Sequence, residues 1–242
     1  MWGNFAQLSL LLRKHLPPFA PSVCESSSKR IEGLIRIDGI LADFGTSQHQ
    51  IFSVRGFSFT VYSPLDMLMS SAHHKVTAAQ LINKSSEQEL IRIFKEYGEE
   101  PHARMIARAI VAQRAHEPFK TTCQLAELVE KIIPRRGARI HPATKIFQAL
   151  RIAVNHELDA IGHFLRQSVQ VLNDGGRLVC ISFHSLEDRL VKQFLLEHKK
   201  RPGMPGFELL IDGVVQASEQ ECARNPASRS AKLRAGVWRI GA

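Results

Sequence analysis

The segment GGRLVCISFHSLEDR at residues 175–189 constrains the fold more than any other part of this 242-residue chain. Two glycines predict a turn, because glycine adopts positive φ without steric cost. The β-branched and apolar run Arg177–Phe183 then predicts a buried strand. Ser185 and Asp188 resemble the N-cap pair of a helix whose apolar residues follow at helical spacing. The segment therefore predicts a strand–turn–helix unit, and in open α/β sheets ligands bind where such strands end.

A second candidate for a buried strand, Ile35–Phe44, lies far from the first, and most of the chain between them is helical in pattern. Apolar residues recur at helical spacing from about residue 77 to 155, with helix-start signals at Ser86 and Thr121. Two strands that flank such a segment predict an α/β protein with an inserted all-helical subdomain. The predicted parts are 1–74 and 156–242 for the α/β core and 75–155 for the helical insert.

Polar side chains follow both predicted strands. Asp43 ends the earlier strand, where a carboxylate can accept hydrogen bonds from an amine or a ribose hydroxyl, and an N-cap or turn aspartate is the alternative. Gln50 can donate and accept hydrogen bonds, and a surface glutamine is its alternative. His184 suits a general base, a metal ligand or a hydrogen-bonding residue at the strand end. No HxH, HExxH or Cys/His cluster accompanies it, so no metal site is expected.

The chain is basic, with 32 Lys and Arg against 23 Asp and Glu and a formal charge of +9. This balance favours an anionic partner, nucleic acid first, over the alternative of a generally basic surface. Basic residues gather around the junction at residues 131–151 and again in the tail. The residues predicted to bind RNA phosphates are Arg135, Arg136, Arg139, Lys145, Arg229, Lys232 and Arg234.

Several classes of protein are disfavoured by what the sequence lacks. Four scattered cysteines without a CxxC pair argue against a disulfide framework and fit a reducing cytoplasm. No apolar run reaches the roughly 18 residues that a membrane span needs. A GxSxG motif around Ser182 or Ser185 is absent, which disfavours hydrolase chemistry, and neither GxGxxG nor a P-loop occurs.

Eight segments of the chain occur in the order in which a known family carries them. They are DGILADFGTSQHQ (38–50), RGFSF (55–59), PLDM (64–67), YGEE (97–100), IARAIV (106–111), HPATKIFQALRIAVNHEL (141–158), GGRLVCISFHSLEDR (175–189) and NPASRSAKLR (225–234). The chain closely resembles the MraW family of bacterial small-subunit ribosomal RNA methyltransferases over nearly its whole length. Several of these segments are long and unusual, which makes the resemblance specific.

The resemblance implies a Rossmann-like, S-adenosylmethionine-dependent methyltransferase core that carries the helical insert. It also implies a cytoplasmic enzyme that methylates N4 of a cytidine in small-subunit rRNA, either free or in the assembled subunit, and it leaves a homodimer open. Phe5, Asp43 and Gln50 match family positions that contact the cofactor. We expect Asp43 and the strand end at His184 and Ser185 to border the target base as catalytic residues, with Gln50 nearer the cofactor.

The chain departs from the family pattern at its beginning. In the family, the counterpart of Gly3-Asn4-Phe5 lies well inside the chain, after a glycine-rich loop and an acidic residue that holds the cofactor ribose. Because this sequence starts with MWGNF, we expect an N-terminally truncated core without its first strands. Leu68 and Ser70 also stand where the family usually reads PLDMRMD. The alternative function is therefore a non-catalytic RNA-binding remnant or a fragment that lacks the cofactor loop.

Overall fold

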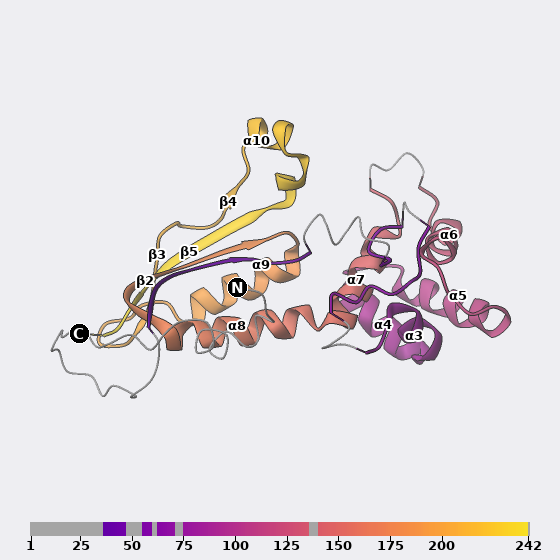
Figure 1. Ribbon diagram of the computed structural model, residues 1–242, viewed down its shortest axis with the longest axis horizontal. Helices are drawn as coiled ribbons and strands as arrows, with labels where there is room; N and C mark the ends of the chain where they lie inside the picture. Colours follow the sequence, from indigo (N-terminus) through magenta and orange to yellow (C-terminus); the bar gives the residue numbers. More distant parts are fainter. Residues whose placement is uncertain (1–35, 47–54, 60–61, 71–74, 136–139, 242) are drawn as a thin grey trace. The chain divides into compact units, whose positions relative to one another are not determined.

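The computed structural model describes residues 36–46, 55–59, 62–70, 75–135 and 140–241. They divide into two compact units (Figure 1), one with the residues up to Gly45 and from Leu158 onward, the other Thr46–Glu157. The sequence pattern assigns residues 46–74 to the α/β core, whereas Leu65 and Met67 of that segment are buried in the core of the helical unit. No helix in the described part of the chain is long and apolar enough to cross a bilayer.

The first unit is built on a mixed β-sheet. Its strands are β1 (Ile37–Asp43), β2 (Leu172–Ser182), β3 (Gly206–Leu209), β4 (Val215–Gln216) and β5 (Lys232–Arg239). The strand order is β1-β2-β5-β3, and β4 pairs with β5 beside this path. β1 and β2 are parallel, while β5 runs antiparallel to β2, β3 and β4. The carboxyl ends of β1 and β2 therefore meet at one edge of the sheet.

Two helices, α8 (Glu157–Val171) and α9 (Ser185–Glu197), cover one face of this sheet (Figure 1). Alternate strand residues point at them, because successive side chains of a strand face opposite sides. The shared core contains Ile40, Ala42, Leu178 and Cys180 from the sheet, Ile161, Phe164 and Leu165 from α8, and Val191, Phe194 and Leu195 from α9. Burial raises the pKa of the Cys180 thiol to about 12, so this cysteine stays protonated inside the core.

The predicted turn at Gly175 and Gly176 is wrong, because both glycines lie inside β2. α8 ends at Val171 and the strand begins at the next residue. Ile37 of β1 pairs with Leu172, but Gly39 pairs with Arg177, so β2 bulges between these positions. Gly175 has φ +75°, a conformation that glycine adopts without strain. The glycines thus produce an irregularity within one strand, and the chain does not reverse there.

The second unit is helical. Its helices are α3 (Ala78–Lys84), α4 (Glu87–Glu96), α5 (Ala103–His116), α6 (Thr122–Ile132) and α7 (Thr144–Asn155). They enclose fully buried side chains such as Ile82, Phe94, Ile106, Leu125 and Leu150. The predicted helix starts are confirmed, since the hydroxyls of Ser86 and Thr121 cap α4 and α6. The structure thus has five helices, α3 to α7, between β1 and β2 among the described residues, as the sequence pattern predicts.

Beyond the sheet, a short extension leads from β4 to β5. It contains α10 (Glu219–Arg224), which has no buried residue, and the 3-10 helix η2 (Pro226–Ser230). Figure 1 shows α10 standing clear of the strands. The extension carries Arg229, and the following strand carries Lys232 and Arg234.

Candidate active site at the carboxyl ends of β1 and β2

Asp43 is the last residue of β1 and pairs in register with Ile181 near the end of β2. The N–H of Phe44 donates to the carbonyl of Ile181 over 2.9 Å, so the two strands stay paired up to this edge. β2 then passes through Phe183 into α9. The fold thus brings Asp43 and the start of α9 to the same edge of the sheet, although they lie far apart in the sequence.

The N-cap of α9 is His184, and the predicted cap at Ser185 is wrong by one residue. The imidazole Nδ1 of His184 accepts the N–H of Glu187 over 3.4 Å, the role that a serine hydroxyl usually has. In return, Glu187 Oε2 accepts the N–H of His184 over 3.4 Å and that of Phe183 over 2.8 Å. Ser185 is the first residue of the helix and its side chain is exposed.

Glu187 is the functional candidate that sequence reasoning missed. It has no exposed surface and belongs to the first turn of α9. Its Oε1 lies 3.0 Å from Nε2 of His184, without the alignment of a hydrogen bond. A Cβ added at Gly45 would lie 3.7 Å from the same oxygen, so the carboxylate adjoins the end of β1. A glutamate three residues after His184 is a capping-box signal with histidine in place of serine or threonine.

Asp43 is exposed, but its carboxyl is not an ordinary surface group. Partial burial, followed by the negative charge of Glu187, raises its pKa above the usual aspartate value. Two carboxylates at one edge repel each other, which favours the protonated form of the more exposed one. A raised carboxyl pKa at the end of a parallel strand is a common property of sites that bind ligands or accept protons.

A second carboxylate of α9, Asp188, is neutralised. Its oxygens accept hydrogen bonds from Arg234 over 2.7 and 3.1 Å, and Nζ of Lys232 lies 3.8 Å away. Burial alone would raise the pKa of Asp188, but Arg234, Lys232 and Lys192 together lower it below the usual value. Arg234 also donates to the carbonyl of Gly213. Of the predicted RNA-binding residues, Arg234 is thus engaged within the protein.

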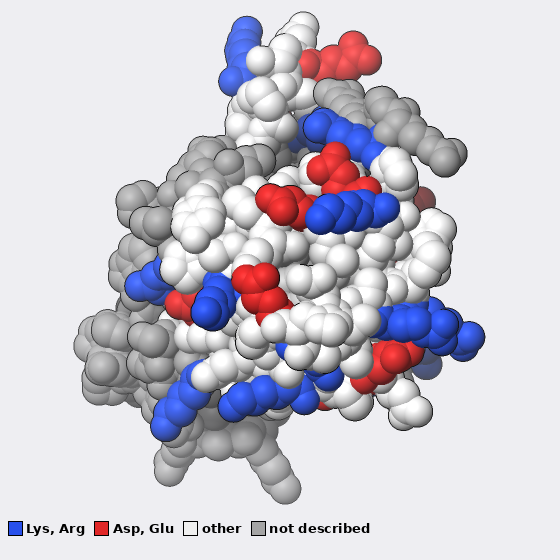
Figure 2. Space-filling view, turned by 90° about the vertical axis from the view of Figure 1, so that its right-hand side faces the viewer, with Lys and Arg blue, Asp and Glu red and all other residues white. Residues whose placement is uncertain are grey.

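The other predicted site residues that the structure describes belong to both units. Arg135 and Arg229 are exposed, and Lys145 is exposed while its ammonium donates to the carbonyl of Glu99 over 3.0 Å. The remaining four predicted residues, which are Phe5, Gln50, Arg136 and Arg139, lie outside the described residues. Figure 2 shows lysine and arginine mixed with aspartate and glutamate on the side of the molecule that it displays. The described part of that face is therefore not a uniformly basic patch.

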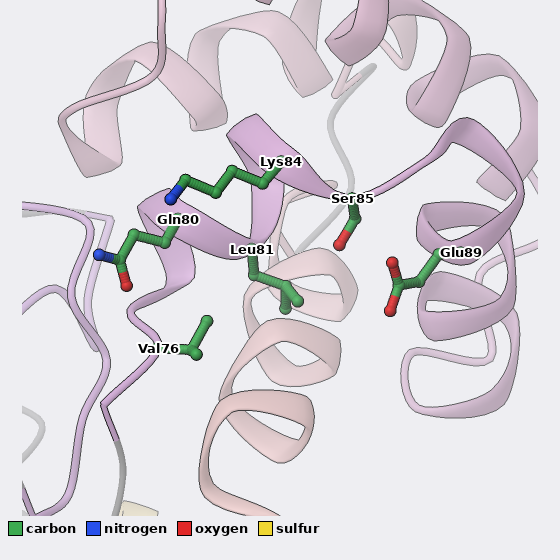
Figure 3. A pocket seen from close by; sticks show the side chains of 6 residues that line it. All are labelled: Val76, Gln80, Leu81, Lys84, Ser85 and Glu89. Atoms are coloured by element: carbon green, nitrogen blue, oxygen red, sulfur yellow. The ribbon is translucent and has the colours of Figure 1, made fainter.

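A hollow of about 440 Å³ lies between α3 and α4 in the helical unit (Figure 3). Val76 and Leu81 form its apolar part, and Gln80, Lys84, Ser85 and Glu89 surround them. Gln80 serves the cap of α3 by accepting the N–H of Thr77 over 3.1 Å. In Figure 3 the polar side chains point in different directions, so we assign no function to this hollow.

Three of the family-like segments meet within the helical unit. The carbonyl of Arg55 accepts the N–H of Met67 over 2.7 Å. Asn155, at the end of α7, donates to the carbonyl of Met67 and accepts the N–H of Met69, both over 2.8 Å. Met67 is fully buried and has φ 61°, which is strained for a residue with a side chain. The buried amide of Asn155 therefore holds this loop in an unfavourable conformation.

A sheet with two parallel strands that end at an acidic edge, and with an antiparallel strand beside them, is consistent with the Rossmann-like α/β fold of methyltransferases. The sequence profile of the MraW methylase family matches residues 13–237. The chain therefore belongs to the MraW methylase family, and this confirms the family predicted from the motifs.

Similar curated proteins share one name. The chain is 49% identical over 216 residues to the ribosomal RNA small subunit methyltransferase H of Thermomicrobium roseum. The matched region covers 84% of this chain and 66% of that protein. The protein of the same name from Syntrophotalea carbinolica is 50% identical over 214 residues, with 82% and 68% covered. That from Rhizobium meliloti is 47% identical over 214 residues, with 83% and 62% covered. The chain thus spans about two thirds of the length of these relatives.

Proposed function

We propose that this protein transfers a methyl group from S-adenosylmethionine to N4 of a cytidine in small-subunit ribosomal RNA. The observation that carries the proposal is the position of Asp43, an acidic side chain with a raised pKa where β1 ends beside β2. Membership of the MraW methylase family supports the reaction class, and the names of the relatives support the RNA. A cytoplasmic location belongs to the same proposal.

The described residues fit such a cofactor. An exposed carboxylate at the ends of parallel strands suits a ligand with a positively charged sulfur and a ribose. We assign Asp43 to this group, together with Phe5 and Gln50, which match cofactor-contacting positions of the family. When bound, S-adenosylmethionine would supply a methyl group whose carbon a nucleophile attacks in line, with the neutral thioether as the leaving group.

The chain's own residues must position and activate the cytidine amine. That amine is a poor nucleophile, because its lone pair is delocalised into the ring, so a hydrogen-bond acceptor beside it helps the reaction. In this proposal Asp43 accepts such a hydrogen bond, and its support is that Asp43, His184 and the exposed Ser185 lie at the same edge of the sheet. Alignment of the amine and stabilisation of its developing charge by Asp43 would then account for much of the rate.

Phosphate contacts would hold the RNA. We assign this role to the exposed Arg135, Lys145 and Arg229, to Lys232, and to Arg136 and Arg139. Arg234, which donates to Asp188 and Gly213, would support the neighbouring strand. Contacts to phosphates set the position of the RNA, whereas contacts to the base at Asp43 would set which nucleotide reacts.

The test is methyl transfer by the Asp43→Ala variant. Small-subunit rRNA and assembled small subunits are supplied in parallel with labelled S-adenosylmethionine, and the modified nucleoside is identified by mass spectrometry. We expect the variant to lose at least about 100-fold in rate, the scale of a positioned proton acceptor. Asp212→Ala, an exposed aspartate on the same unit, serves as the matched control.

Near-normal transfer by Asp43→Ala would refute the assigned role. RNA binding by the unaltered chain with no methyl transfer, and no heat of binding with S-adenosylmethionine, would favour a non-catalytic RNA-binding protein. The coverage of only about two thirds of the relatives' length is the observation that keeps this second function in view.

A further inference from the structure

The carboxylate of Glu187 is buried at the same edge as Asp43, and the resemblance to the family assigned it no role. Its side chain has no exposed surface. Two main-chain N–H groups, of Phe183 and His184, donate to its Oε2, and it lies in the first turn of α9. Donated hydrogen bonds and the positive end of a helix both stabilise an ionised carboxylate. Glu187 therefore places a fixed negative charge next to the end of β1.

Closing a helix start does not require this charge. The capping boxes of α3 and α6 have the same reciprocal hydrogen bonds, and they use the neutral pairs Thr77 with Gln80 and Thr121 with Gln124. Both glutamines do so without a buried charge. Burying a carboxylate has a desolvation cost that a buried amide largely avoids. The buried negative charge of Glu187 is therefore not explained by its part in the capping box of α9.

We propose that Glu187 is a positioning residue that acts through Asp43, because its fixed charge makes the Asp43 carboxylate a stronger proton acceptor for the substrate amine. The proposal rests on the proposed function. In the reaction, the lone pair of the amine nitrogen forms the new N–C bond. The S–C bond breaks and leaves its electron pair on sulfur, and the proton of the amine passes to an oxygen of Asp43. A stronger base at Asp43 accelerates the last transfer.

The charged groups around this edge agree with a direct effect of Glu187 on Asp43. Among the described residues, Glu187 is the charged group that raises the pKa of Asp43, in addition to partial burial. From α9, the imidazole of His184 contacts Glu187 at 3.0 Å. The cations Arg234 and Lys232 of β5 contact Asp188, the acidic residue that follows Glu187 in the helix.

The decisive variant is Glu187→Gln, which keeps the shape and an oxygen to accept the main-chain N–H groups but removes the charge. We expect the pKa of Asp43, followed by carboxyl NMR, to fall toward the ordinary value. The acid limb of the kcat profile should move to lower pH with it, and the plateau rate should fall about three- to tenfold. KM for RNA should not change, because Glu187 has no exposed surface with which to contact RNA.

Glu89→Gln is the matched control. Glu89 occupies the corresponding third position of α4, where its N–H donates to the cap Ser86. Glu89 is exposed and lies in the helical unit, so its replacement removes the same charge from a helix start outside the unit of Asp43, and a general effect of losing one acidic charge would appear in both variants. We expect the Asp43 pKa and the kcat profile to stay as in the unaltered protein.

A double variant, His184→Thr with Glu187→Gln, rebuilds in α9 the capping pair of α6 and protects the test against misfolding. It should fold and should show the same fall in the Asp43 pKa. An unchanged Asp43 pKa in both folded variants would overturn the proposal, and so would an unmoved acid limb. The NMR titration needs no turnover, so a protein that never methylates RNA would refute the proposed function while the coupling of the two carboxylates is still measured.

Discussion

Asp43 and Asp188 are aspartates of the same unit, but the charges of their neighbours have opposite signs. Asp188 lies under Arg234 and Lys232, and its pKa is lowered. Asp43 is partly buried beside another carboxylate, and its pKa is raised. Cations thus neutralise Asp188, whereas the negative charge of Glu187 repels that of Asp43. An ionised group that its own fold disfavours is expected where a ligand or a reaction uses the charge.

The two aspartates also differ in what they connect. Asp188 links α9 to β5, and Arg234 extends the link to the carbonyl of Gly213. Asp43 ends an outer strand of the described sheet and is exposed. We infer that Asp188 contributes to the stability of the folded unit, whereas Asp43 contributes to activity at some cost in stability.

The largest effect on stability is expected from Asp188→Asn. The side chains of Asp188 and Arg234 are only 13% and 12% exposed, so the variant leaves a nearly buried guanidinium without its carboxylate. We expect the free energy of unfolding to fall by about 3 kcal/mol, the range for a broken buried ion pair. Denaturant unfolding at pH 7 measures it. Glu208→Gln, which breaks the exposed pair with Arg239, should cost less than about 0.5 kcal/mol.

The effect of Asp188 depends on pH with a definite sign. Because its pKa is lower in the folded state than in the unfolded chain, its stabilisation is present above the unfolded value of about 4. It is lost as the pH falls through the lowered folded pKa. The difference in stability between Asp188→Asn and the unaltered protein should therefore shrink in acid. A difference that persists undiminished at the lowest pH would contradict the ion-pair assignment.

Asp43→Asn should have a smaller effect of opposite sign. Its folded pKa is raised, so the fold favours the protonated form, and the favourable contribution present below the unfolded pKa is lost as the pH rises through the folded pKa. Removing the charge should therefore stabilise the protein at pH 7, by less than about 1 kcal/mol because the group is exposed. The gain should vanish below about pH 4. A loss of stability at pH 7 would show that Asp43 is a structural aspartate.

These two aspartates illustrate which features can be predicted from the sequence: local patterns can, whereas contacts between distant residues cannot. Helix starts at Ser86 and Thr121 were predictable, because a cap and its partner lie three residues apart. The strand that ends at Asp43 was predictable from its apolar run. The ion pair of Asp188 joins residues 46 positions apart, and it exists only because β5 lies beside β2. No local pattern could therefore reveal that Arg234 is occupied.

The role of Glu187 was hidden for two reasons. Histidine replaces the usual serine or threonine at the cap, so the pattern of Ser185 and Asp188 suggested a frame shifted by one residue. The proximity of Glu187 to Gly45 also depends on the pairing of β1 with β2, which joins distant parts of the chain. The glycines at 175 and 176 misled for a related reason, because positive φ serves a bulge as well as a turn.

Replacing cations that are proposed to bind RNA has the smallest expected effect on the stability of the protein itself. Charge reversal at Arg135 and Arg136 should weaken RNA binding. It should also reduce the slope of log affinity against log salt by about one for each phosphate that the protein no longer neutralises. Lys95→Glu, which alters an exposed lysine of α4 whose neighbours in sequence are Phe94 and Glu96, should leave the slope unchanged. An unaltered slope after reversal at Arg135 and Arg136 would remove this junction from the RNA-binding surface, since a protein that neutralises fewer phosphates must release fewer counterions.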